Sequence, residues 1–214
     1  MKPTGKFISF EGSEGSGKST QIRLLLHRLE QEGITAEILR EPGGTILGEE
    51  IRHLLKHSPK GEGMSQEAEL LLFAASRAQL VREKVRPALD RGEWVLADRF
   101  MDSTTVYQGV ARGLPLDVVE QINNFAVGGC KPDVTILLDV EVGVSRRRLM
   151  AANRTLDRLE KEPAAFFEKV RQGYLDVAKK ESERIVMMDA TIPAETLSEQ
   201  IWQTLQSRFH VLSH

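Results

Sequence analysis

The stretch that decides the fold is "GSEGSGKS", residues Gly12 to Ser19, which directly follows the apolar run "KFISF". A glycine in an ordered segment costs about 0.5–1 kcal/mol relative to alanine, so glycines placed directly after a strand need a reason. The spacing fits G-x-x-x-x-G-K-[ST], in which glycines let successive backbone N–H groups face one anion. Because the stretch follows a predicted strand and opens an amphipathic helix, it predicts a phosphate-binding loop and not a glycine-rich surface turn.

The motif assigns roles within this loop. Lys18 is expected to reach the β- and γ-phosphates of a nucleotide, and the hydroxyl of Ser19 is expected to bind Mg²⁺. The nucleotide-binding residues predicted here are Gly12, Ser13, Glu14, Gly15, Ser16, Gly17, Lys18, Ser19 and Thr20. The motif alone does not decide which reaction follows.

Composition limits the classes of protein that need to be considered. The chain has 214 residues, of which 41 % are hydrophobic and 28 % charged, and this is typical of a globular protein with a sizeable core. A net charge of −2 argues against binding a nucleic acid polymer. The sequence has no apolar run of about 18 residues and no signal peptide, so no membrane partner is expected. The single cysteine, Cys130, excludes an internal disulfide, and we expect a cytoplasmic protein.

Short apolar runs alternate with segments of helical periodicity. The predicted strands are Lys6–Phe10, Ala36–Leu39, Trp94–Ala97, Val134–Leu138 and Arg184–Met188. Helices are predicted around Ile22–Leu29, from about Ser65 to Asp90, around Val118–Phe125, and over Val142–Ala151, Pro163–Lys180 and Ala194–Arg208. This alternation predicts an α/β fold of three layers, with a five-stranded parallel sheet covered by helices on both faces. Ligands of such sheets bind beyond the carboxyl ends of the strands.

Three classes of phosphate-loop protein compete: a GTPase switch, a motor or regulatory ATPase, and a small-molecule kinase. The sequence has no N-K-x-D guanine reader and is short for a motor. The segments after the other strands favour a kinase with a second anionic substrate. These segments are "REPGGT" at Arg40–Thr45, "DRF" at Asp98–Phe100 followed by "STTVYQG", and the helical "LLFAASRAQL" at Leu71–Leu80.

Taken together, these segments resemble those of the bacterial thymidylate kinases, in the same order and with similar spacing from about Phe7 to Ala190. The resemblance implies one P-loop kinase domain, residues 1–214, with a lid segment at about 146–162. It also implies Mg²⁺-dependent transfer of the ATP γ-phosphoryl group to dTMP, and a homodimer. The alternatives are a kinase of another pyrimidine nucleotide or of a deoxynucleoside, and a non-catalytic nucleotide-binding module.

The same resemblance implies which residues bind the acceptor base and sugar. Phe73 stacks on thymine, and Arg77, one helical turn later, hydrogen-bonds a base carbonyl. Thr104 and Gln108 carry hydroxyl and amide groups that can read the pyrimidine edge, and Tyr107 packs against the sugar. Each has a plain alternative: a core residue for Phe73, an ion-paired arginine for Arg77, and ordinary loop polarity for the other three.

Further residues are predicted to bind phosphate, sugar and metal. Arg99 and Arg52 are the candidates for the acceptor phosphate, because a guanidinium group matches phosphate oxygens bidentately. Asp98 ends a strand where a carboxylate near Mg²⁺ is expected. Glu41 lies near the sugar in the family, and Glu11 is expected to contact the sugar hydroxyl or influence the metal site.

Phosphoryl transfer also needs positive charge around the migrating group. The loop positions Ser13, Glu14, Gly15 and Ser16 include no arginine, so the lid is expected to supply it, as in the bacterial lid-arginine type. "LDRLE" places Arg158 firmly in that pattern, whereas "ANRT" shifts Arg154 by one place. The predicted catalytic residues are therefore Lys18, Arg99, Glu11, and either Arg154 or Arg158.

Overall fold

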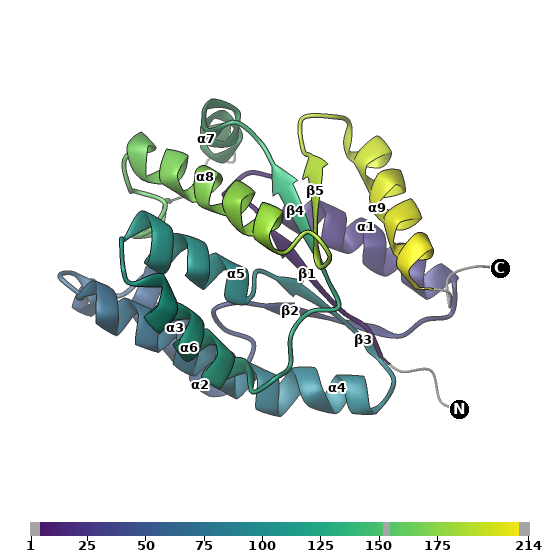
Figure 1. Ribbon diagram of the computed structural model, residues 1–214, viewed down its shortest axis with the longest axis horizontal. Coiled ribbons are helices and arrows are strands. Elements are labelled where there is room, and N and C mark those ends of the chain that lie inside the picture. The colour runs from purple at the N-terminus through teal and green to yellow at the C-terminus, as the bar shows by residue number, and fades with distance from the viewer. Residues whose placement is uncertain (1–4, 152–154, 210–214) are drawn as a thin grey trace.

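A five-stranded parallel sheet forms the centre of the molecule (Figure 1). The computed structural model describes residues 5–151 and 155–209. The strands are β1 (Phe7–Glu11), β2 (Ala36–Arg40), β3 (Trp94–Asp98), β4 (Val134–Asp139) and β5 (Ile185–Asp189), in the order β2-β3-β1-β4-β5. β1 lies at the centre and pairs with both β3 and β4. The predicted α/β class is confirmed.

Each predicted strand is present and ends one residue later than predicted. The added residues are charged: Glu11, Arg40, Asp98, Asp139 and Asp189. The length of an apolar run therefore underestimates the length of a buried parallel strand. Backbone pairing continues into the charged residue at the carboxyl end of each strand. This edge, at the carboxyl ends of the strands, carries most of the predicted site residues.

Helices cover both faces of the sheet, and Figure 1 shows α1 and α9 together on one of them. The helices are α1 (Lys18–Gln31), α2 (Ile46–Lys56), α3 (Gln66–Leu80), α4 (Arg86–Asp90), α5 (Met101–Thr104), α6 (Leu116–Val127), α7 (Val142–Ala151), α8 (Ala164–Lys180) and α9 (Ala194–Arg208). Shorter helical segments are η1 (Pro59–Gly61), η2 (Val81–Val85) and η3 (Thr105–Ala111). Within the described ranges, no helix combines the length and apolar composition needed to cross a bilayer.

Successive side chains of β1 point to opposite faces of the sheet, and the apolar core is divided between these two faces. Ile8 and Phe10 pack with residues of α1 and α9, whereas Phe7 packs with residues of α3, η2 and α4 on the opposite face. A third apolar cluster joins η3 to α8. All five residues of β1 are buried, as expected for a central parallel strand covered on both faces.

The helix predicted from about Ser65 to Asp90 is interrupted in its interior. Ser65 caps α3, whose last residue leads into the π-helical turn η2 and then α4. A second π-helical segment, η3, carries Tyr107 and Gln108. Such turns shift the angular position of side chains and are frequent at functional sites. Among the elements that were not predicted are α2, α5 and η3. Helix α2 does show helical spacing, at Leu47, Ile51, Leu54 and Leu55, and was overlooked, whereas α5 and η3 are short and show no regular period.

A polar cluster crosses the core between β1, β4 and α5. Ser9 and Thr135 share a hydroxyl hydrogen bond of 2.7 Å. The guanidinium group of Arg184, next to β5, donates to Asp102 at 2.7 and 2.8 Å and to Thr135 at 2.6 Å. Asp102 is buried, so its charge depends on Arg184 for compensation.

We expect Arg184→Met to lower the free energy of unfolding by about 3–5 kcal/mol, because it leaves a buried carboxylate without its partner. The matched control is Arg91→Met, which breaks the exposed Arg91–Glu93 pair and is expected to cost less than about 1 kcal/mol. Urea denaturation of both variants measures the difference. Equal losses in the two variants would contradict the role assigned to Arg184.

Candidate active site

The loop between β1 and α1 has the backbone geometry that its glycines predict. Gly12, Gly15 and Gly17 have φ values of 132°, 72° and 96°. A Cβ on Gly12 would lie 2.4 Å from the carbonyl oxygen of Leu138, and one on Gly15 would lie 2.7 Å from that of Ser145. Gly12 and Gly15 therefore allow the loop to approach β4 and α7 closely.

Lys18 is folded back over this loop. Its Nζ atom donates to the carbonyl oxygens of Gly12 at 2.9 Å and Ser13 at 2.8 Å. Burial, with a further contribution from Arg99, lowers the pKa of Lys18 to about 8. The buried ammonium group lies at the N-terminus of α1, which is a favourable place for a phosphate anion.

The two predicted metal ligands lie in contact. The hydroxyl of Ser19 donates to Oδ2 of Asp98 at 2.8 Å, which joins the start of α1 to the end of β3. Among the described residues, there is no cluster of three or more His, Cys, Asp or Glu side chains able to hold a metal. Mg²⁺ is commonly bound by one or two carboxylates together with phosphate oxygens and water, so the Ser19–Asp98 pair fits such a site.

A cleft of ≈ 450 Å³ opens beside the loop, lined by residues 15–21 and, opposite them, by Arg148, Ala190, Ile192, Ala194 and Leu197. Arg148, on α7, donates to the carbonyl oxygen of Ala190 at 3.0 Å, and this contact closes one side of the cleft. The cleft therefore combines backbone N–H groups with an apolar wall that follows β5. That combination suits a phosphate chain attached to a flat, apolar base.

A second pocket lies on the other side of Glu14. It brings together seven of the predicted acceptor-site residues, which come from four separate segments: Glu41, Phe73, Arg77, Arg99, Thr104, Tyr107 and Gln108. Glu14, Pro42, Lys56, Ser103 and Leu159 complete its lining. Phe73 is half-buried and so can present a ring face to a ligand.

Arg99 lines the second pocket and contacts the phosphate loop through Glu14. Its Nη2 atom contacts Oε1 of Glu14 at 2.7 Å, and its Nη1 atom donates to the hydroxyls of Ser103 and Tyr174, both at 3.1 Å. Arg99 has a φ of 72°, a backbone conformation that is uncommon for a residue with a side chain. Burial works against its charge, but Tyr107 and Glu14 outweigh that cost and raise the pKa of Arg99 above its ordinary range. Burial also works against the charge of Glu14, but Arg99 and Lys18 outweigh it and lower the pKa of this carboxyl.

Glu11 is fully buried beneath Arg99. Its carboxylate accepts hydrogen bonds from the backbone N–H groups of Phe100 at 2.8 Å and Ser103 at 3.2 Å. The hydroxyls of Ser103 at 2.6 Å and Tyr174 at 2.8 Å donate to its other oxygen. Burial and the nearby Asp102 raise the pKa of Glu11, and Arg99 partly offsets the rise. Glu11 therefore fixes the turn that presents Arg99.

Arg77 is fully buried behind the second pocket. Its Nε atom donates to both oxygens of Glu41 at 2.9 Å, its Nη1 atom to Asn123 at 2.8 Å, and its Nη2 atom to the hydroxyl of Thr104 at 2.8 Å. Burial raises the pKa of the Glu41 carboxyl to about 7, against the lowering effect of Arg77. Arg77 therefore lines the pocket and also hydrogen-bonds two other lining residues, Glu41 and Thr104.

Two other predicted acceptor residues lie outside this lining. Arg52 donates from Nη1 to the carbonyl oxygen of Pro42 at 2.8 Å, so it lies behind the "REPGGT" loop. Asp98 faces Ser19 and the first cleft. Burial and the neighbouring Arg40 lower the pKa of Arg52.

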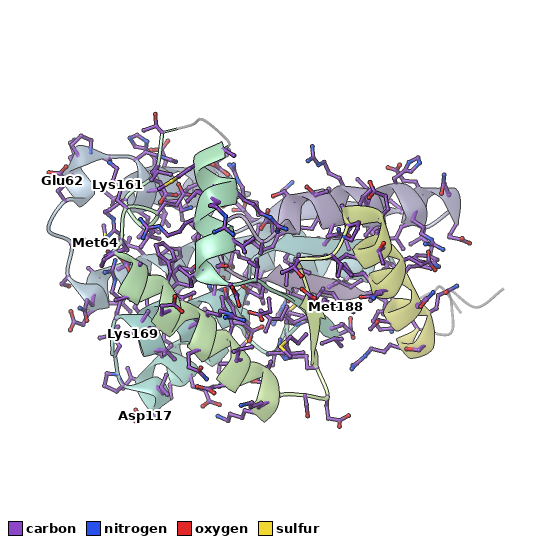
Figure 2. The ribbon with its side chains drawn as sticks, turned by 90° about the horizontal axis from the view of Figure 1, so that it is seen from above. Glu62, Met64, Asp117, Lys161, Lys169 and Met188 are labelled. Carbon is purple, nitrogen blue, oxygen red and sulfur yellow. The ribbon has the colours of Figure 1, made fainter. Side chains whose placement is uncertain are left out.

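The predicted lid is divided between α7, which includes residues 146–151, and a turn within residues 155–162. Arg158 donates from Nε to the carbonyl oxygen of Leu55 at 2.8 Å and from Nη2 to Glu69 at 2.5 Å, while Lys56 pairs with Asp157 at 2.8 Å. Figure 2 shows Lys161 at the same end of the molecule as Glu62 and Met64, which follow α2. Arg154 lies outside the described residues. The turn therefore places Leu159 over the second pocket.

Sequence reasoning missed several residues of both sites. The missed residues are Lys56, Glu69, Ser103, Arg148, Leu159 and Tyr174. Leu159 and Arg148 lie in segments that the sequence analysis had singled out. For Glu69 and Tyr174 the sequence carries only a weak indication of a functional role. Each is a polar residue on the inward face of an amphipathic helix.

Comparisons with known proteins agree with this geometry. The family model described as Thymidylate kinase matches residues 10–201. A thymidylate kinase of Syntrophotalea carbinolica is 47% identical over 210 residues, which cover 96% of this chain and 97% of that protein. One of Kosmotoga olearia is 47% identical over 195 residues, covering 91% and 92%. The crystal structure of thymidylate kinase from Ehrlichia chaffeensis has a TM-score of 0.78 and 32% identity, covering 95% of this chain and 100% of that one. With a cleft beside the phosphate loop, a second pocket that the loop residue Glu14 also lines, and a match along nearly its whole length, the chain belongs to the thymidylate kinase family.

Proposed function

We propose that the chain transfers the γ-phosphoryl group of ATP to dTMP, giving ADP and dTDP. The observation that carries this proposal is the contact between Glu14, a residue of the phosphate loop, and Arg99, since both line the acceptor pocket. ATP in the first cleft and dTMP in the second would direct their phosphates toward each other there. The reaction therefore needs alignment of two anions and neutralisation of their charge.

In this mechanism a phosphate oxygen of dTMP attacks the γ-phosphorus, and the bond to the bridging oxygen of ADP breaks. The acceptor is largely a dianion at neutral pH, since the second pKa of a phosphate monoester is about 6, so no strong general base is needed. Lys18 and Arg99 supply positive charge on the two sides of the transferred group. Glu11 orients Arg99 through the turn at Phe100–Ser103.

We propose Ser19 and Asp98 as the residues that hold Mg²⁺ together with the phosphates of ATP. The metal neutralises charge on the β- and γ-phosphates when bound. In the acceptor pocket, Phe73 stacks on the base, Thr104 and Gln108 read its edge, and Tyr107 packs on the sugar. Glu41 and Arg77 support this wall from behind.

The turn within residues 155–162 is proposed to act as the lid. The acceptor pocket has a free volume of only ≈ 30 Å³, and Leu159 of this turn is one of its lining residues, together with Glu14 and Arg99. Movement of this turn, or release of Arg99 by Glu14, would therefore make room for a nucleotide. Closure around both substrates excludes water and so limits ATP hydrolysis. Arg154 or Arg158 would then supply the remaining positive charge.

An ADP-release assay with ATP and Mg²⁺ tests the proposed reaction against dTMP, dUMP, dCMP, UMP, AMP, thymidine and no acceptor. We expect strong release with dTMP, since the pocket offers a stacking ring and an arginine for the phosphate. Preference for another monophosphate or for thymidine would identify a different kinase. ADP release without an acceptor, or no release at all, would contradict the proposed transfer.

We further propose that two copies of the chain form a homodimer in the cytoplasm, where ATP is supplied. Three exposed apolar side chains, Leu116, Val118 and Phe125, lie on α6, and one, Leu71, lies on α3, the helix against which α6 packs. Phe125 on α6 is 86% exposed, and Leu71 on α3 is 56% exposed. Two such faces, joined symmetrically, would bury these side chains without any change in the site.

We expect Phe125→Glu to convert the homodimer into a monomer, because the symmetric contact would place two carboxylates in an apolar interface. Light scattering after size-exclusion chromatography measures the mass of the particle. The control is Met187→Glu, at a residue of β5 that is also exposed and is expected to leave the mass unchanged. A wild-type protein that elutes with the mass of one chain at micromolar concentration would contradict the homodimer.

A further inference from the structure

Glu69 is a buried carboxylate that the proposed mechanism does not use. It lies in the first turn of α3, 1% exposed, and accepts hydrogen bonds from three side chains of two other segments, η3 with its C-cap and the turn within residues 155–162. The donors are Gln108 Nε2 at 2.8 Å, Arg112 Nε at 3.2 Å and Arg158 Nη2 at 2.5 Å. Burial works against its charge, but these donors outweigh that cost and lower the pKa of Glu69. Glu69 is therefore ionised at neutral pH.

The contact with Glu69 fixes the orientation of the Gln108 amide. An ionised carboxylate accepts hydrogen bonds and cannot donate them, so the NH₂ group of Gln108 must face Glu69. The carbonyl oxygen then points to the opposite side of the amide. Gln108 lines the acceptor pocket. Its oxygen points away from Glu69 and is not, among the described residues, a buried atom that lacks a hydrogen-bond partner. It is therefore available as an acceptor on the side of the amide opposite Glu69.

The neighbouring Thr104 has the opposite polarity. Its hydroxyl oxygen accepts a hydrogen bond from Nη2 of Arg77 at 2.8 Å, which leaves its own hydrogen to be donated. Thr104 lines the same pocket. The pocket wall therefore carries one donor beside one acceptor, and each is oriented by a buried charged residue behind it.

This pattern distinguishes pyrimidine bases. Thymine presents a carbonyl at C4 and an N–H group at N3. Cytosine presents an amino group at C4 and an unprotonated nitrogen at N3, so the order of donor and acceptor is reversed. A site built to hydrogen-bond one edge rejects the other strongly, because the mismatched polar groups are left unpaired in a buried place.

We propose that Glu69 is a positioning residue that determines base specificity: by holding the NH₂ group of Gln108, it directs the amide oxygen to the N3–H of thymine. Glu69 does not touch the substrate. The inference rests on the proposed acceptor site, in which Thr104 donates to the carbonyl at C4. Through Arg158, the same carboxylate also binds the turn that covers the pocket.

The test compares dTMP with 5-methyl-dCMP, which differ only at C4 and N3. We expect the wild-type enzyme to favour dTMP in kcat/KM by at least about 100-fold. In Glu69→Gln, position 69 can present an oxygen or an NH₂ group, so the amide of Gln108 is no longer held in one orientation. We expect the ratio to fall at least tenfold, while the KM for ATP stays within twofold of the wild-type value.

Matched variants distinguish an effect of Glu69 on base specificity from a general effect on the structure of the pocket. Arg112→Gln removes another partner of Glu69 but leaves its contact with Gln108, so we expect the ratio to stay within threefold of wild type. Gln108→Met removes the amide, and adding Glu69→Gln to it is expected to change the ratio no further. If Glu69→Gln does not fold, Glu69→Asp retains the charge but withdraws it by one methylene, and we expect an intermediate ratio.

Two results would overturn the positioning role while leaving the proposed function intact. The first is an equal loss of kcat/KM for both nucleotides in Glu69→Gln, or an unchanged ratio in it or in Glu69→Asp. The second is a further change of the ratio when Glu69→Gln is added to Gln108→Met. A wild-type enzyme that does not phosphorylate dTMP would instead overturn the proposed function, and this inference with it.

Discussion

Two cations, the buried Lys18 and the largely buried Arg99, lie near the carboxyl ends of β1 and β3, and the arrangement around them follows from the need to stabilise their charges. A buried charge without partners is very costly. Lys18 is stabilised by the carbonyl oxygens of Gly12 and Ser13, and Arg99 by Glu14 together with hydroxyl groups. The unusual backbone conformations of Gly12 and Arg99 both serve these contacts.

The same requirement explains how the site can accept substrates. The acceptors that now surround the cations belong to the protein, and phosphate oxygens can replace them without leaving either charge unpaired. Glu14 is central to this exchange, because it belongs to the phosphate loop and also contacts the arginine of the acceptor pocket. In the proposed mechanism, the acceptor phosphate competes with Glu14 for Arg99.

The parts of the fold that repeat a simple pattern could be predicted from the sequence. Apolar runs located all five strands, and helical periodicity gave α7 and α9 their observed limits. The motifs also named most of the residues that line the second pocket, because the resemblance covers the segments around Glu41, Phe73–Arg77 and Arg99–Gln108. The short α5 and the π-helical η3 could not be predicted, since no regular period marks them. Arg77 was predicted to contact the base, and the sequence could not show that Glu41, Asn123 and Thr104 take up its hydrogen bonds. The roles of Glu69 and Tyr174 can be recognised only in the folded structure, where segments that are distant in the sequence contact each other.

The most direct test of the central claim, that ATP and dTMP bind side by side next to the Glu14–Arg99 contact, uses one ligand that spans both sites. Such a ligand carries adenosine and thymidine joined at their 5′ positions by a polyphosphate chain. Isothermal titration calorimetry would measure its stoichiometry, and steady-state kinetics its mode of inhibition. The account predicts one ligand per chain and inhibition that is competitive with both ATP and dTMP. Binding of two ligands per chain, or competition with only one of the two substrates, would contradict it.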